Sequence, residues 1–81
     1  MSAAATSRDA REVVGLGEEA ALAALRMAGV DVRAAGTPQE VRAAWALVLG
    51  CGLVVLTQAA AEVLGEARFA TGAPLTVVVP P

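Results

Sequence analysis

Hydrophobic residues recur along this chain in two alternating patterns. Short aliphatic runs typical of buried strands alternate with longer segments in which apolar residues recur every three or four positions, as on one face of a helix. The runs predicted to be strands are Arg11–Leu16, Val30–Ala35, Gly52–Leu56 and Leu75–Val79. The segments predicted to be helices are Glu18–Ala28, a stretch from Pro38 to a glycine cap at Gly50, and Gln58–Ala70. Strands and helices therefore alternate, starting and ending with a strand.

Residues at the expected helix ends support these boundaries. The threonine, proline, glutamine and glutamate at 37–40 predict a capping box, in which the threonine hydroxyl accepts the glutamate amide and the glutamate reaches back. Gly29 and Gly50 stand where a glycine ends a helix, and Thr57 is a plausible N-cap. The second helix places four apolar residues on one face, interpreted as core: Val41, Ala44, Trp45 and Val48.

Alternation with short connections predicts an α/β fold with right-handed crossovers. We expect one domain over residues 11–81, preceded by a flexible leader at residues 1–10. Its sheet is predicted to be a small doubly wound, four-stranded parallel sheet of order 2-1-3-4, flavodoxin-like but lacking the last strand and the C-terminal helix. The first helix would cover one face and the other two the opposite face. The strands at 53–56 and 75–79 are apolar on both sides. On the face that carries the first helix, part of these two strands would then have no helix packed against it.

One long uncharged run, Ala43–Ala61, approaches the length needed to span a bilayer. Gly50–Gly52 interrupts it, with a helical pattern before and a β-branched pattern after. The interruption favours two packed elements, and a small membrane protein is the alternative.

Composition narrows the function classes. The net charge is −2, and the six basic residues are all arginines scattered along the chain, so no basic stripe favours nucleic-acid binding. With one cysteine, Cys51, and no histidine, neither an internal disulfide nor a His/Cys metal site can form, which fits a reducing cytoplasm.

Residues Gly15–Ala20 match the G-x-G-x-x-A pattern of dinucleotide-binding folds. Such a site also needs an acidic residue at the end of the second strand, but Val32–Gly36 supplies none there. Glu18 and Glu19 would stabilise the helix N-terminus and repel a phosphate. The pattern is therefore interpreted as a tight turn with dipole capping, with a nucleotide site as the alternative.

A phosphoacceptor receiver site is also incomplete. Thr57 stands where the acceptor aspartate would be, and the chain has no lysine. Cys51 and Thr57 have no histidine to act as their base. We therefore predict no catalytic residue, no cofactor and no metal, and keep a degenerate receiver-like or nucleotide-sensing module as the alternative function.

Four segments, in order and with compatible spacing, resemble the F-subunit family of the V-type and archaeal A-type ATPases. They are Gly17–Glu19, Leu25–Val30, Gly52–Thr57 and Ala73–Pro80. The resemblance implies a non-catalytic subunit of the central stalk, which links ATP turnover to the transport of protons or sodium ions. It implies a coiled-coil stalk subunit as partner, contact with the membrane only through the complex, and a peripheral cytoplasmic location.

Members of that family continue into a C-terminal helix with attributed regulatory roles, and those roles do not carry over to these residues. If that helix leaves the third and fourth strands bare, the isolated protein should form a homodimer or bind a hydrophobic dye. Candidate partner-binding residues come from the carboxyl edge of the sheet and from its uncovered face. They are Leu16, Glu18, Phe69, Leu75, Val77 and Val79.

Overall fold

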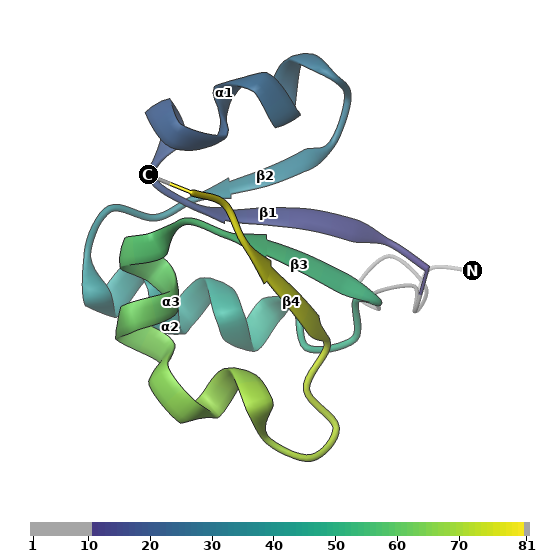
Figure 1. Cartoon of the computed structure of the whole chain (residues 1–81), viewed down its shortest axis with the longest axis vertical. Coiled ribbons are helices and arrows are strands. Elements are labelled where there is room, and N and C mark those ends of the chain that lie inside the picture. The colour runs from purple at the N-terminus through teal and green to yellow at the C-terminus, as the bar shows by residue number, and fades with distance from the viewer. Residues whose placement is uncertain (1–10, 81) are drawn as a thin grey trace.

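The computed structural model describes residues 11–80, and the leader predicted at residues 1–10 lies outside them (Figure 1). The elements are β1 (Val13–Gly17), α1 (Glu19–Met27), β2 (Asp31–Ala34), α2 (Pro38–Leu47), β3 (Leu53–Leu56), α3 (Gln58–Leu64), the 3₁₀ helix η2 (Gly65–Phe69) and β4 (Leu75–Val78). The four strands form one parallel sheet of order β2-β1-β3-β4, which confirms the predicted fold class and strand order.

Alternating side chains divide each strand between the two faces of the sheet. On one face, α2 and α3 pack over the two central strands and form the main hydrophobic core. Its fully buried members include Val14 and Leu16 from β1 and Val54 and Leu56 from β3. Trp45 lies in the same core, as the helical pattern predicts.

Among residues 11–80, α1 is the helix on the opposite face, where it packs on β1 and β2 (Figure 1). Leu22 of α1 is fully buried there, close to Gly15 and Val32. Beyond α1, the side chains of Leu75 and Val77 in β4 are 75% and 51% exposed. Among the residues that the structure describes, the expectation of an uncovered apolar face is therefore confirmed for β4, whereas Leu53 and Val55 of β3 are half-buried.

Three of the four predicted caps are present, at Thr37, at Gly29 and at Thr57. The Thr37 hydroxyl accepts the Glu40 amide at 3.1 Å, while the Glu40 carboxylate accepts the amide of Gly36, one residue earlier than in the standard capping box. At the end of α1, Gly29 has φ +93°, and the Val30 amide donates to the Leu25 carbonyl, as in a Schellman motif.

Other boundaries differ from the prediction. Gly50 does not cap α2, which ends at Leu47 with Val48 as its C-cap. The third helix does not run to Ala70, because Gly65 adopts φ +55° and the chain continues as the 3₁₀ helix η2. Strand ends shift by one or two residues, and β1 extends to Gly17.

The uncharged run at residues 43–61 contains the end of α2, a turn, β3 and the start of α3, so the prediction of two packed elements is confirmed. Within residues 11–80, no helix has the length and apolar character needed to cross a membrane.

Candidate functional site

The centre of the candidate site is the carboxyl edge of β1 and β3, two adjacent strands whose chains leave the sheet toward opposite faces. Open α/β sheets commonly bind ligands at such a point. Gly17, the last residue of β1, has φ +148° and lies against Thr57, the residue after β3. A Cβ atom on Gly17 would lie 2.2 Å from Thr57 Oγ1. Only glycine therefore lets the two strands end this close together.

Thr57 connects three elements through one hydroxyl group. The residue is buried, and its Oγ1 accepts the Ala60 amide at 3.2 Å, which caps α3 as predicted. The same hydroxyl donates to Glu18 Oε1 at 2.5 Å. This hydrogen bond, followed by one from the Glu18 backbone, lowers the pKa of the Glu18 carboxyl below its ordinary value. An ionised carboxylate is thus held over the edge of the sheet.

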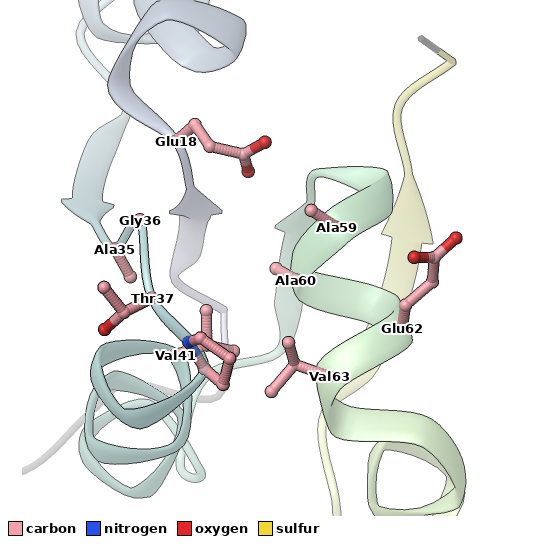
Figure 2. A pocket seen from close by; sticks show the side chains of 10 residues that line it. Glu18, Ala35, Gly36, Thr37, Val41, Ala59, Ala60, Glu62 and Val63 are labelled. Atoms are coloured by element: carbon pink, nitrogen blue, oxygen red, sulfur yellow. The ribbon is translucent and has the colours of Figure 1, made fainter.

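Two hollows flank this carboxylate. The first, with a volume of about 360 Å³, lies between the β2–α2 connection and α3 (Figure 2). Its lining is made mainly of small and aliphatic residues: Glu18, Ala35, Gly36, Thr37, Pro38, Val41, Ala59, Ala60, Glu62 and Val63. In Figure 2 the Glu18 carboxylate projects toward the space between the two helices, with Val41 and Val63 at the far end.

The second hollow, of about 540 Å³, lies on the β4 side of the same edge. It is lined by Glu18, Ala21, Thr57, Gln58, Ala59, Glu62, Val79 and Pro80. Glu18, Ala59 and Glu62 border both hollows, so the two hollows adjoin each other at these residues.

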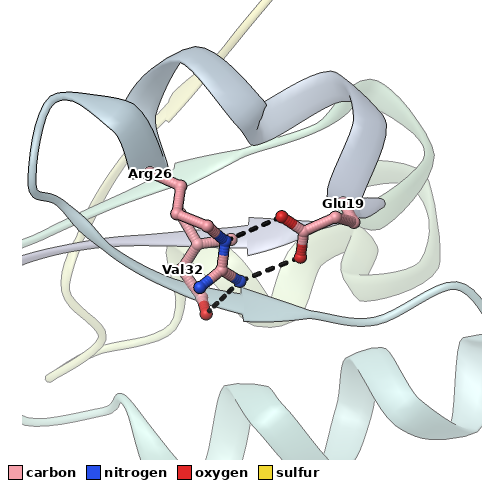
Figure 3. A network of polar contacts seen from close by, with 3 residues as sticks. All are labelled: Glu19, Arg26 and Val32. Carbon is pink, nitrogen blue, oxygen red and sulfur yellow. Dashed lines mark hydrogen bonds and ion pairs between the residues drawn. The ribbon is translucent and has the colours of Figure 1, made fainter.

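The second acidic residue of α1 is engaged within its own helix (Figure 3). Arg26 donates through two nitrogens to the Glu19 carboxylate at 2.7 and 2.8 Å, and through one of them to the Val32 carbonyl at 3.3 Å. These hydrogen bonds lower the pKa of the Glu19 carboxyl and raise that of the Arg26 guanidinium. Glu19 is therefore paired, whereas Glu18 faces the hollows.

The two glycines of the G-x-G-x-x-A pattern belong to β1. A Cβ on Gly15 would meet the side chains of Leu25 and Val32 at 3.4 Å, an ordinary van der Waals contact, so the packing of α1 does not require glycine there. Gly17 lies against Thr57, and Glu18 places its carboxylate at the edge where a phosphate would have to bind. This arrangement favours the turn interpretation. Among residues 11–80, no group of three metal-ligating side chains is present.

The predicted partner-binding residues fall into separate places. Leu16 is fully buried in the core, because its position in β1 faces α2 and α3; its assignment to a contact surface was wrong. Glu18 and Val79 both border the second hollow at the carboxyl edge. Leu75 and Val77 project from the uncovered face of β4.

Phe69 lies near the opposite end of β4. It is 70% exposed, and it borders a third hollow together with Leu75. The Arg68 guanidinium lies 4.3 Å from the centre of the Phe69 ring and also donates to the Thr76 hydroxyl. Phe69 is therefore presented at the surface by a cation–π contact.

Sequence reasoning missed Ala59 and Glu62, which border both hollows. The signal was present in the N-cap at Thr57, since counting helical positions from this cap places both residues on the first two turns of α3. Their position facing Glu18 depends on how α3 packs, which the pattern does not specify.

No protein-family model matches the sequence, and no curated protein matches it. The likeness to the F-subunit family therefore rests on the four segments that resemble it, Gly17–Glu19, Leu25–Val30, Gly52–Thr57 and Ala73–Pro80.

Proposed function

We propose that this chain is a non-catalytic coupling subunit of the central stalk of a V-type or A-type ion-translocating ATPase. It would bind the coiled-coil stalk subunit, in the cytoplasm, and contact the membrane only through the complex. The observation that carries this proposal is an aliphatic surface across three strands, here called the β4 face. It consists of the exposed residues Val13, Leu75 and Val77 together with the half-buried Leu53 and Val55.

The register of the sheet aligns these side chains in two rows. Val13, Leu53 and Leu75 are paired across β1, β3 and β4, and Val55 and Val77 form the next row. Parallel strands are normally covered on both faces, and α1 covers only β1 and β2. A long helix with an apolar stripe would cover such a surface, which is the chemistry that a coiled-coil subunit offers.

The segments that resemble the F-subunit family coincide with the framework of this fold. Gly17–Glu19 lies where β1 ends and α1 begins, and Leu25–Val30 contains the Schellman motif that ends α1. Gly52–Thr57 contains β3 and the cap of α3, and Ala73–Pro80 contains β4. The resemblance therefore includes strands of the β4 face as well as the carboxyl edge.

Calorimetric titration with the coiled-coil central-stalk subunit encoded in the same genome tests this proposal. We expect submicromolar binding of the stalk subunit and no binding of ATP or NAD. Leu75→Glu should weaken stalk binding at least tenfold, because it places a charge in an apolar contact. Leu47→Glu is the matched control, since Leu47 is 62% exposed on α2 and lies outside the β4 face. Nucleotide binding without stalk binding would instead support the nucleotide-sensing alternative.

The same surface predicts how the isolated protein behaves. With the β4 face open, we expect dimerisation or binding of a hydrophobic dye, both reduced by Leu75→Glu. A monomer that binds no dye would contradict the role of this surface.

A further inference from the structure

The two edge strands of the sheet differ in charge. β2 and β4 are the edges, since each has a single neighbour in the order β2-β1-β3-β4. Charged side chains on an edge strand discourage pairing with another chain, and β2 carries Asp31 and Arg33, whose side chains approach to 3.6 Å. The side chains of β4, Leu75–Val78, are all uncharged. The edge at β4 is therefore the one that can accept a further strand.

The backbone of β4 directs a short row of polar groups outward. The Val79 amide donates to a carbonyl of β3, so the odd-numbered residues of β4 turn their backbone groups inward. Thr76 and Val78 then direct their N–H and C=O groups outward, and within residues 11–80 no strand pairs with them there. Pro74 and Pro80 stand at the next outward positions and have no N–H, which confines the open donors to the segment between them.

Two opposite charges lie at the two ends of this edge, on the side of the sheet that carries α2 and α3. Arg68 of η2 lies near the start of β4, where it donates to the Thr76 hydroxyl at 3.2 Å. Glu62 of α3 lies near its end, bordering a hollow with Val79 and Pro80. Figure 2 shows the Glu62 carboxylate on the β4 side of α3, directed away from the first hollow. In the part of the chain that the structure describes, neither charge belongs to an ion pair.

An edge with this arrangement is complementary to itself. A two-fold axis perpendicular to the sheet at Val77 makes two β4 strands antiparallel, so the outward backbone groups of Thr76 in one copy face those of Val78 in the other. The Arg68 end of each copy then lies beside the Glu62 end of the other. We propose that the β4 edge binds a second copy of this chain, forming a symmetric dimer with one continuous sheet through both copies.

This dimer is weak and oriented by charge. Four-residue strands bury little area, so the contact belongs with small, transient interfaces. Exposed charge pairs add little energy each, but they select the orientation of the partner and reject others. On the other side of the sheet, Leu75 and Val77 of the two copies become neighbours, which joins their β4 faces. The inference does not depend on stalk binding, because it concerns the edge of β4 and leaves the β4 face open.

Charge exchange between copies is the first test, measured by sedimentation equilibrium of the isolated chain at low salt over a concentration series. Glu62→Arg makes both ends of the edge positive, and Arg68→Glu makes both ends negative. Each variant alone should dimerise at least about tenfold more weakly than wild type. An equimolar mixture of the two should recover the dimer, because opposite charges then face each other at both ends. Arg42→Glu is the matched control, since Arg42 is exposed on α2 and should leave dimerisation unchanged.

Amide hydrogen exchange of the wild-type chain is the second test. The Thr76 and Val78 amides should exchange at least about fivefold more slowly at high concentration than at low, while the Val77 amide, which faces β3, is protected at both. A dimer that persists in both charge variants and leaves the Thr76 and Val78 amides unchanged would overturn the edge contact. A chain that stays monomeric but binds a hydrophobic dye would also overturn it. Both results leave the proposed function standing.

Discussion

Replacing Gly17 with alanine tests whether the close contact between the end of β1 and Thr57, the residue after β3, requires glycine. The added Cβ would lie 2.2 Å from Thr57 Oγ1 and 2.4 Å from Thr57 Cγ2, and Gly17 has φ +148°. The clash cannot be relieved by a flexible side-chain end, because the Thr57 side chain is buried and its hydroxyl is held by Glu18 and Ala60.

The expected cost has two sources. A non-glycine residue in this region of backbone space costs roughly 1–3 kcal/mol. Displacing Thr57 removes the N-cap of α3, which costs about 1 kcal/mol, and weakens the hydrogen bond to Glu18. We therefore expect Gly17→Ala to lower the free energy of unfolding by about 3–5 kcal/mol, a large part of the roughly 4–12 kcal/mol expected for a chain of this length.

Urea unfolding followed by the fluorescence of Trp45, the only tryptophan, measures this loss. Gly15→Ala is the matched control in the same strand, because its Cβ would meet its nearest neighbours at 3.4 Å and Gly15 has no positive φ. It should stay within about 1 kcal/mol of wild type. Adding Thr57→Ala to Gly17→Ala removes two of the three closest atoms, so the double variant should be more stable than the sum of the single losses predicts.

Equal stability of the Gly17→Ala and Gly15→Ala variants would refute this reasoning. It would mean that β1 and β3 can separate at their carboxyl ends without cost, and that Thr57 does not depend on the missing side chain.

Three further results are expected. Folding lowers the pKa values of the Glu18 and Glu19 carboxyls, so the unfolded state binds more protons in acid than the folded state does. The free energy of unfolding should therefore fall as the pH drops below about 4. Urea titrations at pH 6 and pH 3 should show a smaller fall for Glu18→Gln than for wild type. Leu75→Glu should change the free energy of unfolding by no more than about 0.5 kcal/mol, whereas truncation of the fully buried Leu56 to alanine should cost about 2–5 kcal/mol in the same assay; similar losses would show that the β4 face is covered. Gly65→Ala should cost about 1–2 kcal/mol in thermal unfolding, because Gly65 has φ +55° in open space, and no loss would mean that the break after α3 can straighten.

The helices, the strands and their order could be predicted from the sequence, because hydrophobic periodicity and helix caps depend on residues only a few positions apart. Thr37 and Thr57 cap the helices that their positions predict, since a side-chain oxygen needs only an amide three residues away. The break at Gly65 was missed because the apolar pattern continues past this residue, whereas the chain adopts φ +55° there and continues as a 3₁₀ helix.

The site was less accessible to sequence reasoning. Leu16 and Leu75 both belong to aliphatic strands, but Leu16 is fully buried and Leu75 is 75% exposed, because α2 and α3 cover the central strands on one face, whereas on the other face α1 packs on β1 and β2. The hydrogen bond between Glu18 and Thr57 joins residues 39 positions apart, and no local pattern specifies it. Hydrophobic periodicity therefore predicted the strands, but the packed structure was needed to show which of their residues are exposed and which distant side chains are hydrogen-bonded.

The strand order has a kinetic consequence for synthesis of the chain. β1 is an inner strand, yet one of its two neighbours is β3, so Val14 pairs with Val54 only after most of the chain has been made. Such distant contacts require a large loop to close before they stabilise anything, which slows folding. Until Leu53–Leu56 leaves the ribosome, β1 has no neighbouring strand at the edge where β3 later pairs. During that time its aliphatic residues are accessible to chaperones or to neighbouring nascent chains.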